Sequence, residues 1–193
     1  MRILPALILA AALPATADAA TVASGATLRD DAGGINVTGT AVSIYANYAT
    51  YWQGTTTPES EWVWEGDAYS VDEVDFSFEF DLTGYDVSTA SLAGLIGVDN
   101  TVTVYLNGNE FFSHSGFTSL VSYGTAEASY FLPGLNVLSY EAVDLGGPGS
   151  FRATVTVTAD VAATPAVPLP AGAPLMIGAF ALLGALGMRA KRG

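Results

Sequence analysis

Flat aromatic side chains with polar ends crowd into one short stretch of the chain. Such rings stack on the faces of sugars, and they also fill the cores of β-sandwiches. Trp62 and Trp64 alternate with Val63 and fall on one strand face, which favours core packing. Trp52 precedes Gln53-Gly54 and three threonines, which favours a wet loop. If the protein binds a ligand, these features place the contact near Trp52. The stretch contains Tyr45, Tyr48, Tyr51, Trp52, Trp62, Trp64 and Tyr69, and the predicted glycan contacts are Tyr48, Tyr51 and Trp52.

Clustered carboxylates offer a second kind of chemistry. Asp72, Glu73 and Asp75 fall within four positions, and hard oxygen ligands of this kind suit Ca²⁺. The spacing does not match an EF-hand loop. Two interpretations stay open, a structural calcium ion or acids solvated in a turn, and we expect no other cofactor.

Catalytic constellations are poor. The chain has one histidine, His114, which we place in a serine-rich loop, and no cysteine. A serine triad needs a nucleophile, a base and an orienting carboxylate, and no Gly-x-Ser-x-Gly elbow is present. Without cysteine and with a single histidine, a typical zinc site is nearly excluded. We therefore expect a protein that is not an enzyme.

The charge of the chain is strongly negative and unevenly distributed. Acidic residues outnumber basic ones 19 to 6, for a formal charge of −13. Four of the bases lie at the extreme termini, so residues 20–166 hold 18 acids and 2 arginines. Such a chain repels phosphate, which argues against nucleic acid as a partner. It suits a saline habitat, because salt screens the repulsion between copies.

The N-terminus has the three parts of a secretory signal peptide. Arg2 is followed by an apolar stretch, residues 3–13, and then by a small, polar segment that ends in Ala17-Asp18-Ala19. Small residues at these positions predict cleavage after Ala19, with Ala17 as the alternative. Residues 1–19 are therefore the predicted signal peptide, and signal peptidase is an expected partner.

The C-terminus carries a motif, an apolar segment and a basic cluster in that order. The motif consists of Val167, Pro168, Leu169, Pro170 and Ala171, within an Ala/Pro linker at 162–171. Residues 172–188 carry no charge and extend about 25 Å as a helix, near the short limit for a transmembrane span. The tail, 189–193, contains Arg189, Lys191 and Arg192, which should stop transfer and stay cytoplasmic.

This order resembles the PEP-CTERM class of bacterial sorting signals, and residues 167–171 match its VPLPA variant letter for letter. The resemblance implies processing by an exosortase, a membrane protease of the transpeptidase type. The protein is then expected to cross the inner membrane and stay anchored there by its C-terminal helix. After sorting it would reach the cell surface or the extracellular matrix.

The middle of the chain predicts an all-β domain over residues 20–161. Alternation with period two places Phe76, Phe78, Phe80 and Leu82 on one face, and Asn107-Gly108 can form a type I′ turn. Asp99-Asn100 is interpreted as a two-residue hairpin between two strands. The short strands and frequent turns predict an antiparallel β-sandwich of the jelly-roll type. The predicted core is Phe76, Phe78, Phe80, Leu92, Ile96, Val98, Val102, Val104, Leu106, Leu138, Tyr140, Val155 and Val157.

Residues 60–155 show a second resemblance. The segments FDLTG, DN, VYLNG and PGLNVL resemble a domain common among PEP-CTERM proteins and, more widely, the galactose-binding-like jelly roll beside many glycoside hydrolases. In those hydrolases the domain is non-catalytic. The resemblance implies a binding domain, with extracellular polysaccharide as the expected partner. The alternatives are a purely structural biofilm or surface component and, less favoured, a secreted hydrolase.

Overall fold

The structure is a computed structural model that describes residues 19–28, 33–37, 42–43, 60–66, 68–69 and 72–163. The chain divides after Ala162 into two units. The predicted signal peptide, sorting motif, membrane helix and basic tail fall almost entirely outside the described residues. Within those residues, no helix has the length and hydropathy needed to cross a membrane.

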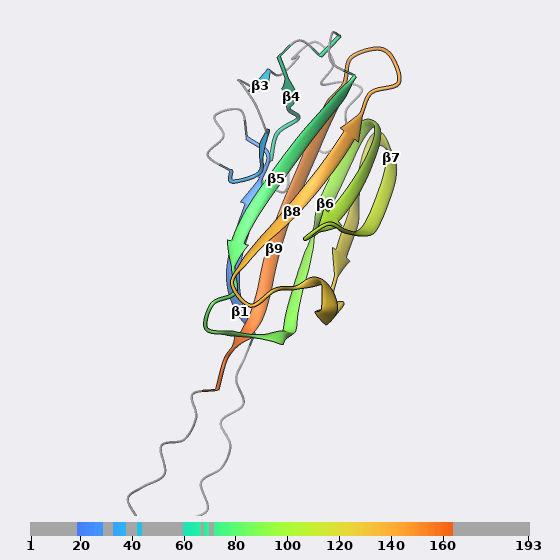
Figure 1. Ribbon diagram of the computed structural model, residues 1–193. Coiled ribbons are helices and arrows are strands. Elements are labelled where there is room, and N and C mark those ends of the chain that lie inside the picture. Colours follow the sequence, from blue (N-terminus) through green and yellow to red (C-terminus); the bar gives the residue numbers. More distant parts are fainter. Residues whose placement is uncertain are drawn as a thin grey trace, which may run out of the picture. The chain divides into compact units, whose positions relative to one another are not determined.

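The described part of the chain is built almost entirely from β-strands, and Figure 1 labels all but one of them. One short 3₁₀ turn, η2 (Ala128–Tyr130), follows the longest strand pair. The strands are β1 (Ala20–Ala26), β2 (Asn36–Val37), β3 (Val42–Ser43), β4 (Trp64–Glu65), β5 (Glu73–Asp81), β6 (Tyr85–Leu106), β7 (Asn109–Thr125), β8 (Leu135–Val143) and β9 (Ser150–Val161).

Seven of these strands form one antiparallel sheet that curls into two layers. The hydrogen-bonded order is β1-β9-β6-β8-β5-β2, with β7 paired to β6. Residues 85–99 of β6 pair with β9, and residues 101–106 pair with β8. The strand β6 therefore belongs to both layers, and its partner β7 follows it. The predictions of an all-β class and of antiparallel pairing are confirmed.

The two layers meet through aromatic side chains. The rings of Phe76 on β5 and Phe151 on β9 have centroids 4.4 Å apart, and those of Tyr140 on β8 and Phe151 are 5.2 Å apart. Because β5 and β8 do not hydrogen-bond to β9, these contacts cross from one layer to the other. All thirteen predicted core residues are buried. The alternation of apolar and polar residues was enough to predict these buried positions, because a half-buried strand turns every second side chain inward.

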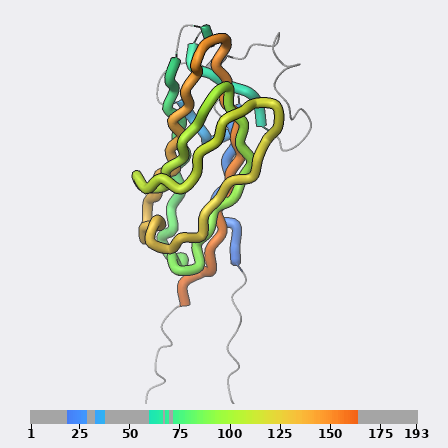
Figure 2. Tube along the Cα trace, turned by 90° about the vertical axis from the view of Figure 1, so that its right-hand side faces the viewer, coloured from blue at the N-terminus to red at the C-terminus, as the bar shows by residue number. Residues whose placement is uncertain are grey.

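The hairpin predicted at Asp99-Asn100 is wrong. The chain stays in β6 there, and its two halves pair with different strands rather than with each other. The β6–β7 ribbon instead bends at this point, with register shifts on both sides, and passes from one layer to the other (Figure 2). Corners of this kind let one strand serve two sheets.

Polar side chains fasten the corner to the loop between β8 and β9. The Asn100 Oδ1 accepts a hydrogen bond of 2.6 Å from the Leu145 N–H. Its Nδ2 donates to the Asp99 Oδ1 at 2.7 Å, and the Ser115 hydroxyl donates to its carbonyl. Asn100, a residue type common in turns, therefore connects two backbone segments here by hydrogen bonds.

Candidate functional site

The predicted glycan contacts Tyr48, Tyr51 and Trp52 lie outside the described residues, and so do the sorting motif and the terminal bases. Trp62 and Trp64 are buried, as predicted. Trp64 packs between the layers, 6.4 Å from the ring of Phe76. Its indole lies so close to Gly149 that an added Cβ would approach within 2.4 Å of it, so this loop position requires glycine.

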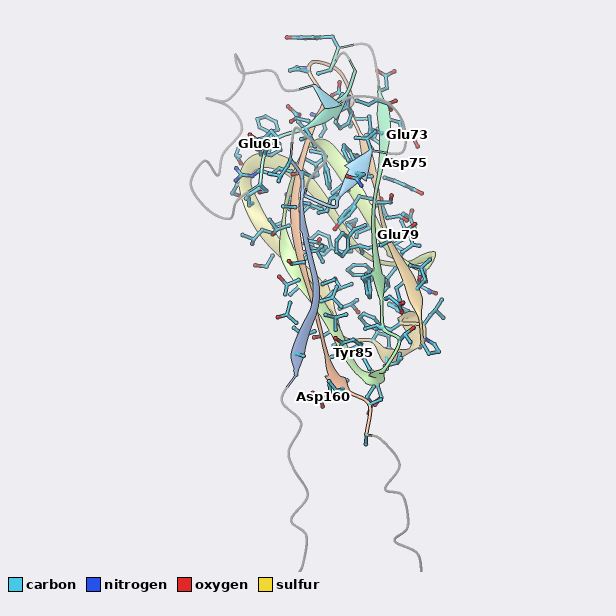
Figure 3. The ribbon with its side chains drawn as sticks, turned by 90° about the vertical axis from the view of Figure 1, so that its left-hand side faces the viewer. Glu61, Glu73, Asp75, Glu79, Tyr85 and Asp160 are labelled. Atoms are coloured by element: carbon cyan, nitrogen blue, oxygen red, sulfur yellow. The ribbon has the colours of Figure 1, made fainter. Side chains whose placement is uncertain are left out.

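The calcium candidates Asp72, Glu73 and Asp75 are all exposed. Glu73 and Asp75 lie one after the other along β5, together with Glu79 (Figure 3). No group of three acidic, histidine or cysteine side chains suited to a metal ion occurs among the described residues. These three acids therefore do not form a cage around a common point.

His114 lies within β7, opposite Val102, and not in the loop expected for it. Its Nε2 is 3.1 Å from the carbonyl oxygen of Gly116, and its ring centroid is 6.5 Å from that of Phe112. The ring is half-buried against its own strand. This environment explains the histidine as part of the strand structure.

A groove of about 640 Å³ lies beside β7 in the described part of the chain. It lies between the start of β7 and the segment that runs from the end of β7 into η2. The lining residues are Glu110, Phe111, Phe112, Ser113, Thr125, Glu127 and Tyr130.

A β-bulge places two consecutive phenylalanines in this groove. Tyr105 pairs with Glu110 and Val104 pairs with Phe112, so Phe111 is an extra residue in β7. Without a bulge, neighbouring side chains would point to opposite faces of the strand, whereas a bulge redirects one of them. Both phenylalanines are half-buried and pack against the core.

The aromatic floor continues inward. The Tyr123 ring centroid lies 6.4 Å from that of Phe111 and 5.8 Å from that of Phe112. The Tyr123 hydroxyl is 2.6 Å from that of Tyr140 and donates to the Thr154 carbonyl at 2.9 Å. Burial raises the pKa of both tyrosines, so they stay neutral hydrogen-bonding groups. The floor is therefore held by both layers.

One wall of the groove is held by hydrogen bonds of two asparagines, one from the segment VYLNG and one from the segment PGLNVL. The Asn136 Oδ1 accepts from the Leu132 N–H and from the Asn107 Nδ2, both at 2.8 Å. Its Nδ2 donates to the carbonyls of Leu132 and Gly134. Asn107 also donates to the carbonyl of Tyr130. The asparagines of VYLNG and PGLNVL therefore position the groove and do not line it.

The Asn107-Gly108 turn has the backbone angles that the sequence predicts. The φ angles are 51° at Asn107 and 80° at Gly108, as a type I′ turn requires. The turn starts β7 next to β6, so it sets where the groove begins.

Two carboxylates stand among the polar lining residues. Glu127 caps η2, where its Oε1 accepts from the Ser129 hydroxyl at 2.9 Å and from the Ser129 N–H at 3.4 Å. Glu110 is exposed at the beginning of β7. The groove thus combines aromatic faces with hydroxyl and carboxylate groups, a pattern able to stack on a ring and accept hydrogen bonds from its substituents.

Sequence reasoning did not find this groove. Its signal was the pair Phe111-Phe112, which interrupts the alternation directly after a two-residue turn. Two adjacent large apolar side chains near a strand start can indicate a bulge.

The chain matches no known protein family and no curated protein. Solved structures with a distant likeness include a family 35 carbohydrate-binding module from an environmental isolate, 11% identical, covering 69% of this chain and 96% of that one, with a TM-score of 0.39. A Podospora anserina β-(1,4)-mannanase is 16% identical over 75% of this chain and 29% of that one, with a TM-score of 0.39. A β-glucuronidase from an uncultured Clostridium is 14% identical, with a TM-score of 0.36. It covers 48% of this chain, which spans only 20% of that enzyme. No residue's role is transferred from any of them.

Proposed function

We propose that this chain is an exported surface or matrix protein whose β-sandwich, wound as a jelly roll, binds a glycan without catalysis. The strand arrangement supports a jelly roll if each bent strand is counted as two. One layer then has β1, β9, the first half of β6 and the second half of β7, and the other has β5, β8 and the remaining halves. Export, exosortase sorting and a cell-surface location are part of the proposal, and they rest on the two chain ends described above.

The observation that carries the binding function is the composition of the groove. Phe111, Phe112 and Tyr130 are the aromatic lining residues, and Ser113, Thr125 and the two glutamates are polar residues beside them. A sugar ring presents the complementary surface, with C–H groups on its face and hydroxyls around its edge. The volume of about 640 Å³ falls within the range of about 300–1,000 Å³ usual for ligand sites.

The rigid support of the groove favours a binding function over a purely structural role. The floor rests on the Tyr123–Tyr140 pair, and the wall on the Asn107–Asn136 pair, both fixed by hydrogen bonds. Pre-formed sites lose less conformational entropy when they bind.

The test compares two substitutions at Phe111. Phe111→Ala removes a stacking surface. It should weaken binding to any glycan that the parent protein binds about tenfold, the equivalent of ~1.4 kcal/mol. Phe111→Trp keeps a flat ring and should retain binding. Binding is measured by affinity electrophoresis and calorimetry against a polysaccharide panel, and thermal unfolding of both variants checks the fold. If the protein binds no glycan, or binds equally with Ala at this position in a folded domain, the proposed site is wrong.

The sorting part has its own test. N-terminal sequencing and intact mass of extracellular protein should show a chain that starts at Ala20 and lacks the C-terminal apolar segment. Full-length protein confined to the cytosol would contradict the proposal.

A further inference from the structure

Among the described residues that line the groove, two are acidic and none is basic. The acids are Glu110 and Glu127, and the other described lining residues are aromatic or carry hydroxyls. Two hydrogen bonds from Ser129 hold the Glu127 carboxylate in place, and its Oε1 accepts both of them. Glu110 lies at the start of β7 and Glu127 caps η2, so an acidic residue borders the groove on each of these two segments.

The rest of the domain adds to this potential and does not offset it. Residues 20–166 hold 18 acids and 2 arginines. The arginine whose position is described, Arg152, is only 3% exposed, and its Nε donates to the Ser60 hydroxyl. Burial lowers the pKa of Arg152, although the nearby charge of Glu61 opposes this. An approaching anion would be repelled at long range and in the groove, whereas a cation would be attracted.

We propose that the groove takes an amine-bearing glycan, a polymer that contains de-N-acetylated amino sugars, and rejects polyuronates. This inference rests on the proposed glycan-binding function and names its ligand class. The sugar face stacks on Phe111 or Phe112. The protonated amino group forms charge-assisted hydrogen bonds with the carboxylates, and the aromatic faces also attract it.

Three oligosaccharides of equal length separate the inference from the proposed function. They are a deacetylated glucosamine oligomer, its fully N-acetylated counterpart and a polygalacturonate oligomer. Binding is measured at mildly acidic pH, at which the amino groups of the deacetylated oligomer are protonated. The deacetylated oligomer should bind about tenfold more tightly than the acetylated one, and the difference should shrink at high salt. The polyuronate should not bind.

Charge variants locate the effect. Glu110→Gln should weaken binding of the deacetylated oligomer severalfold and weaken binding of the acetylated one much less, because the amide loses the charge and keeps an acceptor for sugar hydroxyls. The matched control is Glu79→Gln, which removes the same charge from β5, separated from β7 by β8 and β6. This control should change neither affinity measurably at moderate salt, and thermal unfolding confirms that both variants are folded.

Each outcome is decisive. If the acetylated and deacetylated oligomers bind equally, or if Glu79→Gln weakens binding as much as Glu110→Gln does, the inference fails while the glycan-binding function stands. Preferential binding of the polyuronate also overturns the inference. If none of the three oligomers nor any member of the wider polysaccharide panel binds, it is the proposed function that fails.

Discussion

The two layers of the domain expose very different outer faces. The outer face of the layer with β5 and β8 is acidic, and it also presents Tyr105. The outer face of the layer with β1 and β9 carries mainly hydroxyls and small side chains. Its charged residues in the described part of the chain are the paired Asp86 and Asp160 at one end and the buried Arg152 on β9. We call the first the acidic face, with Glu73, Asp75, Glu79, Asp81 and Glu141. We call the second the hydroxyl face, with Thr21, Ser24, Ser91, Ala93, Ser122, Thr154, Thr156 and Thr158.

The difference shows that the charge is not required by the fold. Both faces come from the same alternation of inward apolar and outward polar residues, and threonine suits an exposed strand position better than an acid does. The acidic face even sets Asp75 directly opposite Glu141, an arrangement that is unfavourable between strands. The acids therefore contribute to the negative field of the surface and not to strand pairing, and in the proposed function this field acts on ligands of the groove.

The largest expected effect would show whether the two faces belong to one cooperative unit. Phe151 packs on Phe76 and Tyr140 across the layers, so Phe151→Ala should cost about 3–5 kcal/mol of the free energy of unfolding. Denaturation should remain a single transition by tryptophan fluorescence and by far-ultraviolet circular dichroism. Two separate transitions would mean that the layers fold independently.

A smaller loss is expected where the acidic layer holds the β6–β7 ribbon. Asn136 is fully buried and takes part in four hydrogen bonds, so Asn136→Ala leaves the Leu132 N–H and two carbonyls without this partner. The expected cost is about 1–3 kcal/mol, measured by denaturant unfolding. Glycan binding should weaken too, because the wall beside Tyr130 loses its support. An unchanged stability would show that water replaces the amide.

The sequence predicted the strand interiors well and the features that depend on pairing poorly. Alternation in β5 and β9 fixed which side chains are buried, because period two is a local property. The corner at Asp99-Asn100 was misinterpreted, since a local turn signal does not say which strands pair on either side. The groove was missed for the same reason: the bulge at Phe111 exists only in the register between β6 and β7.

The connection between the two layers should respond to pH. Asp144 begins the loop from β8 to β9. Burial, the larger cause, and the nearby charge of Asp72 raise its pKa above 3.8, although hydrogen bonds from the Gly146 and Leu145 N–H groups oppose this. A raised pKa in the folded state means that the protonated form is favoured there. Its contribution to stability is present below 3.8 and is lost as the pH rises through the raised value.

Asp144→Asn imitates the protonated form and keeps an oxygen that can accept from Gly146. The variant should match the parent protein below pH 3.8 and become more stable than the parent as the pH increases to neutral. Thermal unfolding across this range measures the difference. A variant less stable than the parent at neutral pH would show that the loop requires the charge.

The smallest expected effect tests the acidic face itself. Glu141→Gln removes the repulsion from Asp75 and keeps an acceptor for the Tyr105 hydroxyl, which donates to the Glu141 Oε2 at 3.0 Å. Stability at low salt should rise by about 0.2–1 kcal/mol, and the gain should disappear at high salt because the repulsion is screened. Thr156→Glu on the hydroxyl face is the matched comparison, since Ser24 and Ala93 lie opposite it and carry no charge. This added charge should change stability little at either salt concentration. If Thr156→Glu shows as strong a salt dependence as Glu141→Gln, the repulsion is a property of the whole domain and not of the acidic face.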